Sequence, residues 1–210
     1  MSKQILLPSE MFRLRSAKFP KGKEMTIDEV AEVVGPEFKE MNVNPPPEVV
    51  DTKNKMQGKK AYVQNPQEVQ PFLLHILAAL RAQYLMYQTS HWQTKGPAYY
   101  GNHLLFQRLY ESAQGEIDAV AEKLVGYTGA ASVGLPAQIE LIERYCSRWC
   151  AVENLHERGL VSEKEVQKLL KFTYDTLKAK GELTLGLDDW LMATSSAHET
   201  NVYLLQQVLS

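Results

Sequence analysis

Two histidines twelve residues apart, followed by two carboxylates four residues apart, are the most informative feature of this sequence. They are His91 and His103, then Asp118 and Glu122. Imidazole nitrogen together with carboxylate oxygen suits iron, zinc or manganese. These residue types in this order therefore predict a metal site.

The spacing also predicts how such a site is assembled. Residues 99–125 are expected to form one helix, on which His103 and Gln107 share a face because they are four residues apart. His103 and Asp118 are fifteen residues apart, which is roughly 22 Å along a helix axis. No single ion reaches both ends. Either there are two separate clusters, or a two-fold axis near the helix middle brings one copy's His103 beside the other copy's Glu122, forming two identical sites.

The pattern resembles the Dps family (DNA-binding protein from starved cells), the mini-ferritins, over about residues 66–210. The resemblance implies a four-helix ferritin-like subunit, a hollow shell of about twelve subunits, and a ferroxidase centre shared across two-fold interfaces. It is carried by a His-Trp pair, a Gly, a second His and an Asp-x-x-x-Glu-Lys motif: His91, Trp92, Gly96, His103, Asp118, Glu122 and Lys123.

By this resemblance, His91 and His103 of one subunit act with Asp118 and Glu122 of its neighbour as the metal-binding and catalytic residues. The expected cofactor is iron, taken up as Fe2+, oxidised to Fe3+ and stored in the shell, which protects the cell against oxidative damage. Trp92 has two interpretations. It packs in the core or at an interface, as aromatic side chains commonly do, or it is, by resemblance, an oxidisable ring beside the iron.

One ligand position departs from the family. The family usually has an aspartate four residues after the second histidine, where this chain has Gln107. A carboxamide keeps a neutral oxygen for ligation but lacks the negative charge, so binding of a hard cation is weakened. An alternative function follows, a ferritin-like structural shell or interaction protein with weak or no ferroxidase activity.

The composition limits the classes of protein. A formal net charge of −2 and a pI near 6.2 give no general attraction to nucleic acid. The two cysteines, Cys146 and Cys150, are expected to be small core residues, and their number suggests no disulfide framework. A secretory signal and a membrane span are not expected, because the amino terminus lacks a long apolar run and the run around His75 is short. A cytoplasmic location is the expectation.

Residues 1–65 form an amino-terminal extension, longer than the tails common in the family, before the bundle expected over residues 66–210. Its first part is basic, and a Lys/Arg arm can bind DNA without sequence preference by neutralising phosphates. In that case the protein would associate with the nucleoid. Acidic residues follow, so packing against the shell or another protein is the alternative. The candidate DNA-binding residues are Lys3, Arg13, Arg15, Lys18, Lys21 and Lys23.

The bundle is expected to be all-α. The first helix should run to about residue 95 and the second should end at Gly126 and Gly129. A short amphipathic helix should start at Pro136 as an extra element. Gly159 should break the chain, Ser162 should cap the next helix, and a final helix should span about residues 183–209.

Rival metal ligands within one subunit are weaker. A Glu-x-x-His motif occurs at Glu153 and His156, where the expectation is a solvated helix end with the imidazole near the negative end of the helix dipole. His198 and Glu199 are adjacent and so point about 100° apart on a helix, which makes a poor ligand pair. His75 is expected to be a core or interface residue.

Overall fold

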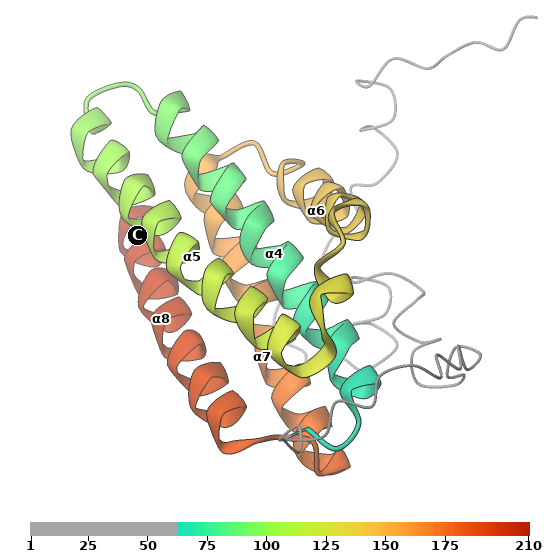
Figure 1. The fold of residues 1–210 in the computed structure, drawn as a ribbon. Coiled ribbons are helices and arrows are strands. Elements are labelled where there is room, and N and C mark those ends of the chain that lie inside the picture. The colour runs from blue at the N-terminus through green and yellow to red at the C-terminus, as the bar shows by residue number, and fades with distance from the viewer. Residues whose placement is uncertain (1–62) are drawn as a thin grey trace, which may run out of the picture. The chain divides into compact units, whose positions relative to one another are not determined.

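The computed structural model describes residues 63–210, and these residues fold as a four-helix bundle with one extra short helix (Figure 1). Helices α4, α5, α7 and α8 form the bundle, and α6 packs beside α4. The expected all-α fold is thereby confirmed, whereas the amino-terminal arm lies outside the described residues. The elements are α4 Pro66–Gln93, α5 Tyr99–Thr128, the 3-10 turn η2 Ala130–Val133, α6 Leu135–Trp149, α7 Leu155–Lys180 and α8 Leu185–Leu209.

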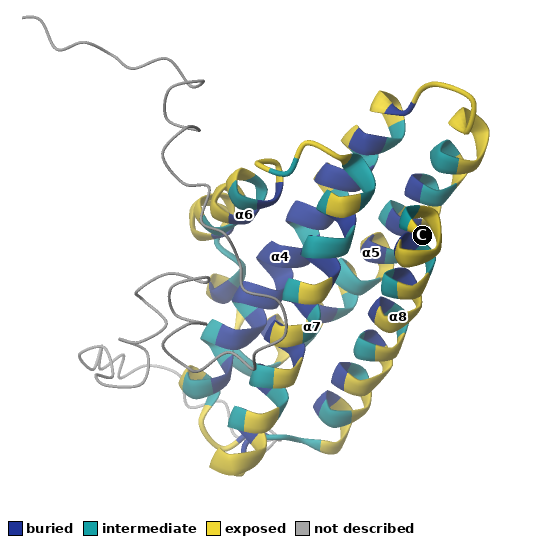
Figure 2. Ribbon diagram, turned by 180° about the vertical axis from the view of Figure 1, so that it is seen from behind, coloured by how far each residue is buried: buried dark blue, intermediate teal, exposed yellow. Residues whose placement is uncertain are grey.

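Helix α4 is the centre of the core. It is buried on nearly every side, as Figure 2 shows by its dark colour, because α5, α6 and α7 all pack against it. Leu73, Ile76 and Leu80 on it are fully buried. The outer faces of α5 and α8 are exposed by contrast, which gives these helices the one-sided pattern of a surface helix. None of the helices in residues 63–210 is long and apolar enough to cross a membrane.

Helix α7 begins earlier than its sequence suggests. The side chain of Asn154 caps it by accepting hydrogen bonds from the backbone N–H groups of His156 and Glu157, at 2.9 and 3.1 Å. The expectation that Ser162 caps this helix was therefore wrong, and Ser162 lies buried two turns inside it.

Gly159 was expected to break the chain, but it lies within α7. A Cβ atom at this position would lie 3.2 Å from Leu205 and 3.3 Å from Tyr87. The glycine therefore allows α7 to pack closely against α4 and α8, because a larger side chain would press on both neighbours. Gly126 likewise lies inside α5, which ends at Gly129 with a positive φ of 88°.

The bundle is tied to the start of α4 by one carboxylate. Glu182, which is 8% exposed, follows α7 and accepts hydrogen bonds from the backbone N–H groups of Gln64 and Asn65, at 2.9 and 3.0 Å. Lys180 adds an ion pair of 2.7 Å with Glu68. These contacts fix where the chain joins the bundle, while the domain boundary at residue 65 stays a prediction.

We predict opposite outcomes for the same substitution at the two helical glycines. Gly159→Leu should lower the free energy of unfolding by about 1–3 kcal/mol, because the new side chain overlaps Leu205 and Tyr87. Gly126→Leu should not lower it, since nothing lies within 4 Å of its Cβ position. Urea denaturation followed by circular dichroism measures both, and equal effects would contradict the packing described for α7.

Candidate metal centre

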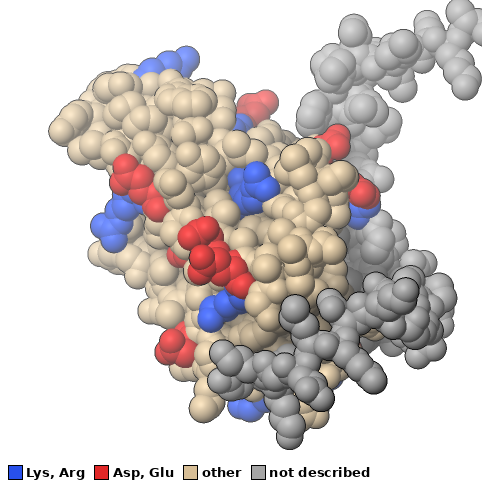
Figure 3. Space-filling model, viewed as in Figure 1, with Lys and Arg blue, Asp and Glu red and all other residues tan. Residues whose placement is uncertain are grey.

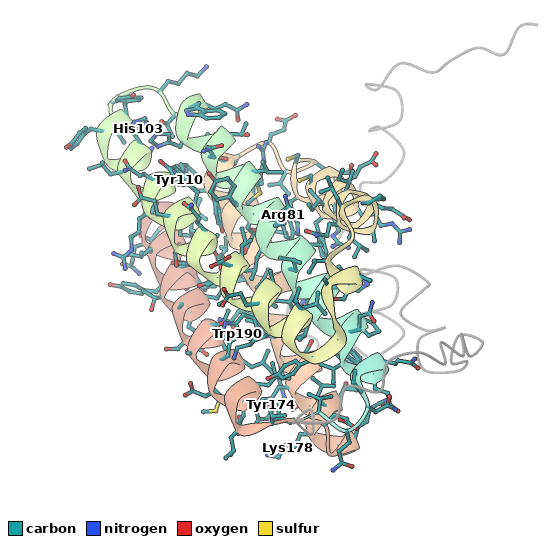
Figure 4. All side chains as sticks on the ribbon, viewed as in Figure 1. Arg81, His103, Tyr110, Tyr174, Lys178 and Trp190 are labelled. Atoms are coloured by element: carbon teal, nitrogen blue, oxygen red, sulfur yellow. The ribbon has the colours of Figure 1, made fainter. Side chains whose placement is uncertain are left out.

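The fold brings His91 and His103 together. His91 lies in the last turn of α4 and His103 in the second turn of α5, so the short connection between the helices stacks their rings. The ring centroids are 3.5 Å apart and the planes differ by 22°. Figure 4 shows His103 near the end of the bundle where α4 passes into α5.

The two imidazoles are fixed by reciprocal hydrogen bonds. Nδ1 of His91 donates to the backbone carbonyl of His103 at 2.8 Å, and Nδ1 of His103 donates to the carbonyl of His91 at 3.0 Å. A carbonyl only accepts, so each Nδ1 carries a proton, and in the neutral form of either ring the lone pair would lie on Nε2. This is the arrangement by which proteins orient histidine ligands for a metal. Neither Nε2 atom is used by these two hydrogen bonds, and the role of His91 and His103 as metal ligands stays a prediction.

Tyrosines surround this histidine pair. Tyr99 stacks on His103 with centroids 5.0 Å apart, and Tyr110 meets His91 edge-on at 5.5 Å. Trp92, in contrast, is 67% exposed. Packing of Trp92 in the core of the chain is thus wrong, and its role beside iron stays a prediction.

Gln107 lies one turn after His103, as the helix register requires. Its Nε2 donates to the Glu111 carboxylate at 2.8 Å, so the amide points along α5 away from His103. Its carbonyl oxygen has no recorded hydrogen bond within residues 63–210. Gln107 as a metal ligand stays a prediction.

The two carboxylates do not join the histidines within one chain. Asp118 and Glu122 are exposed on the later part of α5, and neither has an ion pair or hydrogen bond with a described residue. The neighbouring Lys123 instead donates to the carbonyl of Gly186 at the start of α8, at 3.1 Å. In residues 63–210, no three His, Cys, Asp or Glu side chains form a group that could hold a metal ion. One chain therefore presents separate halves of the predicted site.

A second group of ionisable residues lies in the bundle centre, and sequence reasoning missed it. We call Tyr87, Glu116, Glu163 and His198 the buried ionic cluster, to which α4, α5, α7 and α8 each contribute one residue. His198 donates through Nδ1 to Glu163, and its Nε2 lies 3.1 Å from a carboxylate oxygen of Glu116. Tyr87 donates to Glu163 at 2.6 Å, and Asn201 donates to it at 3.3 Å.

The charges of this cluster stabilise one another. Burial alone would lower the pKa of His198, but the carboxylates of Glu163 and Glu116 outweigh it and raise that pKa to about 10. Burial and Glu163 also raise the pKa of Tyr87 well above its ordinary value, so the phenol remains a donor. The cluster places a cationic imidazole between two carboxylates. Its ion pairs and hydrogen bonds therefore link α4, α5, α7 and α8 to one another.

The other candidate metal ligands do not come together as a metal site within residues 63–210. His156 lies in the first turn of α7, at the positive end of the helix dipole, so the expected position at a negative end was wrong. Burial lowers its pKa, and its ring lies 5.1 Å from that of Phe106. His75 is a core residue, as expected, with Nδ1 3.2 Å from the hydroxyl of Tyr145. Glu199 is exposed while His198 is buried, so they do not act as a pair.

The cysteines are less buried than expected. Cys146 is partly exposed and Cys150 is exposed, and both are free thiols, so the description of both as core residues was wrong. Burial raises the pKa of Cys146 to about 11, which makes it a poor nucleophile at neutral pH.

The basic residues of the extension lie outside the described residues, so binding of DNA by them stays a prediction.

Comparison with known proteins decides the family. The model of the ferritin-like domain matches residues 72–208. The chain belongs to the ferritin-like family. Among curated proteins, a nutrient stress-induced DNA-binding protein of Nostoc is 26% identical over 98 residues, which cover 46% of this chain and 53% of that relative. This chain thus matches about half the length of that relative.

Solved Dps structures share the ferritin-like fold of this chain. Dps from Staphylococcus aureus superposes with a TM-score of 0.59 and 21% identity, covering 70% of this chain and 97% of that one. Mycobacterium smegmatis Dps gives a TM-score of 0.60 and 18% identity, covering 76% and 94%. Dps from Vibrio cholerae, described as a member of a broad superfamily of ferritin-like diiron-carboxylate proteins, gives 0.58 and 14%, covering 69% and 91%. The resemblance to Dps is therefore confirmed, and the shared property that these structures show is the fold.

The buried ionic cluster of this ferritin-like chain should control its stability at alkaline pH. The folded-state pKa of His198 is about 10, above the unfolded value near 6.5, so folding takes up a proton between these values. The contribution of His198 is thus complete below about pH 6.5 and is lost as the pH rises towards 10. His198→Gln should lower the free energy of unfolding at pH 7 by about 3–5 kcal/mol.

The measurement is denaturant unfolding of parent and variant from pH 6 to 10. The difference between them should shrink as the pH rises. Glu199→Gln is the matched control, since Glu199 is the exposed neighbour, and it should leave the curve unchanged. A difference that is constant across this range would show that His198 is not charged in the folded protein.

Proposed function

We propose that this protein is a mini-ferritin that oxidises Fe(II) to Fe(III) at a centre shared by two copies of the chain and stores the ferric product in a hollow shell of about twelve subunits. The observation that carries the proposal is the reciprocal bonding of His91 and His103, which leaves two Nε2 lone pairs as ligands. The twelve-subunit number comes from the resemblance to Dps.

The proposed roles divide between neutral and anionic ligands. His91 and His103 hold Fe(II) as neutral imidazoles. Asp118 and Glu122 of the second copy complete the site, and their negative charge favours Fe(III) over Fe(II) because the attraction grows with the charge of the ion. Each Fe(II) loses one electron, and peroxide or dioxygen accepts it. Sharing of the site follows from the roughly 22 Å of helix between the two halves.

Exposed apolar residues near the histidines support the proposal that a second copy of the chain covers this part of the surface. Trp92 is 67% exposed, Tyr100 is 71% exposed and Leu104 on α5 is 43% exposed. Large apolar side chains gathered on one surface are typical of protein–protein interfaces. Trp92 follows His91 on α4, and Tyr100 and Leu104 lie within one turn of His103 on α5, so a contact over this end of the two helices would bury apolar residues and complete the ligands together.

The alternative is a ferritin-like shell with little oxidase activity. Gln107 favours it, because its amide supplies no charge and its Nε2 is directed to Glu111. A cytoplasmic location belongs to either proposal and is supported by the free thiols Cys146 and Cys150.

A complementation experiment tests the shared site. His103→Ala chains and Asp118→Asn chains should each oxidise Fe(II) at least roughly tenfold more slowly than the parent, since each lacks one ligand per site. When the two variants are unfolded together and refolded, a mixed pair has one site with both halves intact. The mixture should therefore regain activity, up to about half of the parent in a mixed pair. The rate is followed by absorbance of the ferric product.

His156→Ala is the matched control for loss of a histidine outside the site, and it should oxidise iron like the parent. No recovery in the mixture would show that the halves do not act across an interface. A parent no faster than buffer would support the structural shell instead.

We predict that Gln107→Asp speeds iron oxidation by about tenfold, equivalent to ~1.4 kcal/mol. The new carboxylate lies one turn from His103, where it can attract the ferric product. An aspartate cannot donate the hydrogen bond that Gln107 gives to Glu111, and the two carboxylates repel each other. The melting temperature without metal should therefore fall.

Gln107→Asn is the control, because it shortens the side chain equally but adds no charge. Oxidation rates and melting temperatures are measured with and without a redox-inert divalent metal. Identical behaviour of Gln107→Asp and the parent would remove position 107 from the site.

A further inference from the structure

An arginine and a glutamate remain without ionic partners on an exposed strip of α5 about 140° wide, which runs around the helix from His103 past Asp118 and Glu122 to Arg108. Arg108 and Glu111 are both exposed, and neither forms an ion pair within residues 63–210. Glu111 is nevertheless held in place, because its carboxylate accepts a hydrogen bond of 2.8 Å from Gln107. Some other exposed charges of the bundle pair within the chain, as Lys171 does with Asp175 at 2.6 Å, whereas Arg108 and Glu111, like Asp118 and Glu122, form no ion pair with a described residue.

Helix geometry places Glu111 in the middle of this strip. At about 100° per residue, Glu111 lies about 20° around the helix from Asp118 on one side and from Glu122 on the other, and about 80° from His103. Arg108 lies about 60° from Glu111 and roughly 4.5 Å before it along the axis. Figure 3, drawn from the side on which α5 lies in front, shows charges of both signs on this face.

The proposed two-fold axis passes close to the same residues. If His103 meets the partner's Asp118 or Glu122, the axis crosses α5 near the midpoint, at about residues 111–112. Residues before the midpoint then face residues after it in the other copy. Arg108 then lies level with a point on the partner's α5 roughly 4.5–7.5 Å along the axis from the partner's Glu111, a displacement that its long side chain can span.

Negative charges gather near this two-fold axis. Two Glu111 carboxylates approaching across an interface repel each other, and both copies already bring two further carboxylates to their shared sites. Arginine is suited to neutralise them, because its guanidinium can hold a carboxylate with two parallel hydrogen bonds. A two-fold axis forms each such contact twice.

We propose that Arg108 of each copy pairs with the partner's Glu111, and that these two ion pairs set the register in which the histidine half-site meets the carboxylate half-site. The inference rests on the shared centre of the proposed function. It also explains Gln107, whose amide orients Glu111 for the partner.

A charge exchange tests the proposal. Arg108→Glu places like charges opposite each other at two positions, as does Glu111→Arg, so each variant should dissociate at a protein concentration at least roughly tenfold higher than the parent. Added salt should reduce both defects. The double variant Arg108→Glu/Glu111→Arg restores opposite charges and should assemble like the parent. Light scattering after size-exclusion chromatography gives the mass as a function of concentration.

The matched control is Asp175→Arg, a charge reversal on the exposed face of α7, which should leave assembly unchanged. Circular dichroism checks that each variant is folded. Normal assembly of both single variants, or failure of the double variant to recover, would overturn the pairing.

Iron oxidation separates this proposal from the proposed function. Loss of activity in His103→Ala together with normal assembly of the charge variants would reject the ion pairs and keep the shared centre. A parent that remains monomeric would reject both.

Discussion

The carboxylate of Glu163 is the group on which the bundle depends. It is fully buried, and a buried charge is costly unless it is paired and hydrogen-bonded. Tyr87 from α4 and both Asn201 and His198 from α8 supply its partners, and His198 in turn lies against Glu116 of α5. The four helices are therefore held in one relative register, because sliding any of them would leave a charge without its partner.

The histidine pair is likewise held in one arrangement by hydrogen bonds. Each imidazole is held by the main chain of the other, so their arrangement is set by how α4 passes into α5 rather than by a flexible side-chain contact. The carbonyl of His91 also accepts a hydrogen bond from the hydroxyl of Thr94, at 2.9 Å. The orientation of the two imidazoles is thus set by the turn between the helices.

Much of this arrangement could be predicted from the sequence, and the failures have physical causes. Helical periodicity and the His-Trp motif indicated the bundle and the paired histidines. The start of α7 was misplaced because glycine commonly breaks helices, whereas Gly159 lies within α7 and lets Tyr87 and Leu205 pack closely against it. Its cap, Asn154, is a residue type that favours caps, so that signal was present.

The buried ionic cluster was missed because its members come from four separate helices. A signal existed in the apolar pattern: Glu163 stands three residues before Val166 and seven before Leu170, and so lies on the buried stripe of α7. His198 lies seven residues from both Leu191 and Leu205. Charged residues on apolar stripes of two helices indicate partners, but periodicity alone does not say which residues they are.

The uninterrupted helix α5 also limits which insertions the sequence can accept. Helix α5 carries His103 of one proposed half of the centre and both carboxylates of the other, on thirty residues without interruption. Inserting one residue between His103 and Asp118 would turn the carboxylates about 100° away from the histidines. Reassembly about a shifted two-fold axis could correct the lengthwise displacement but not this rotation. Because every copy would carry the same insertion, no subunit could compensate for another, and the segment should vary by substitution rather than by length.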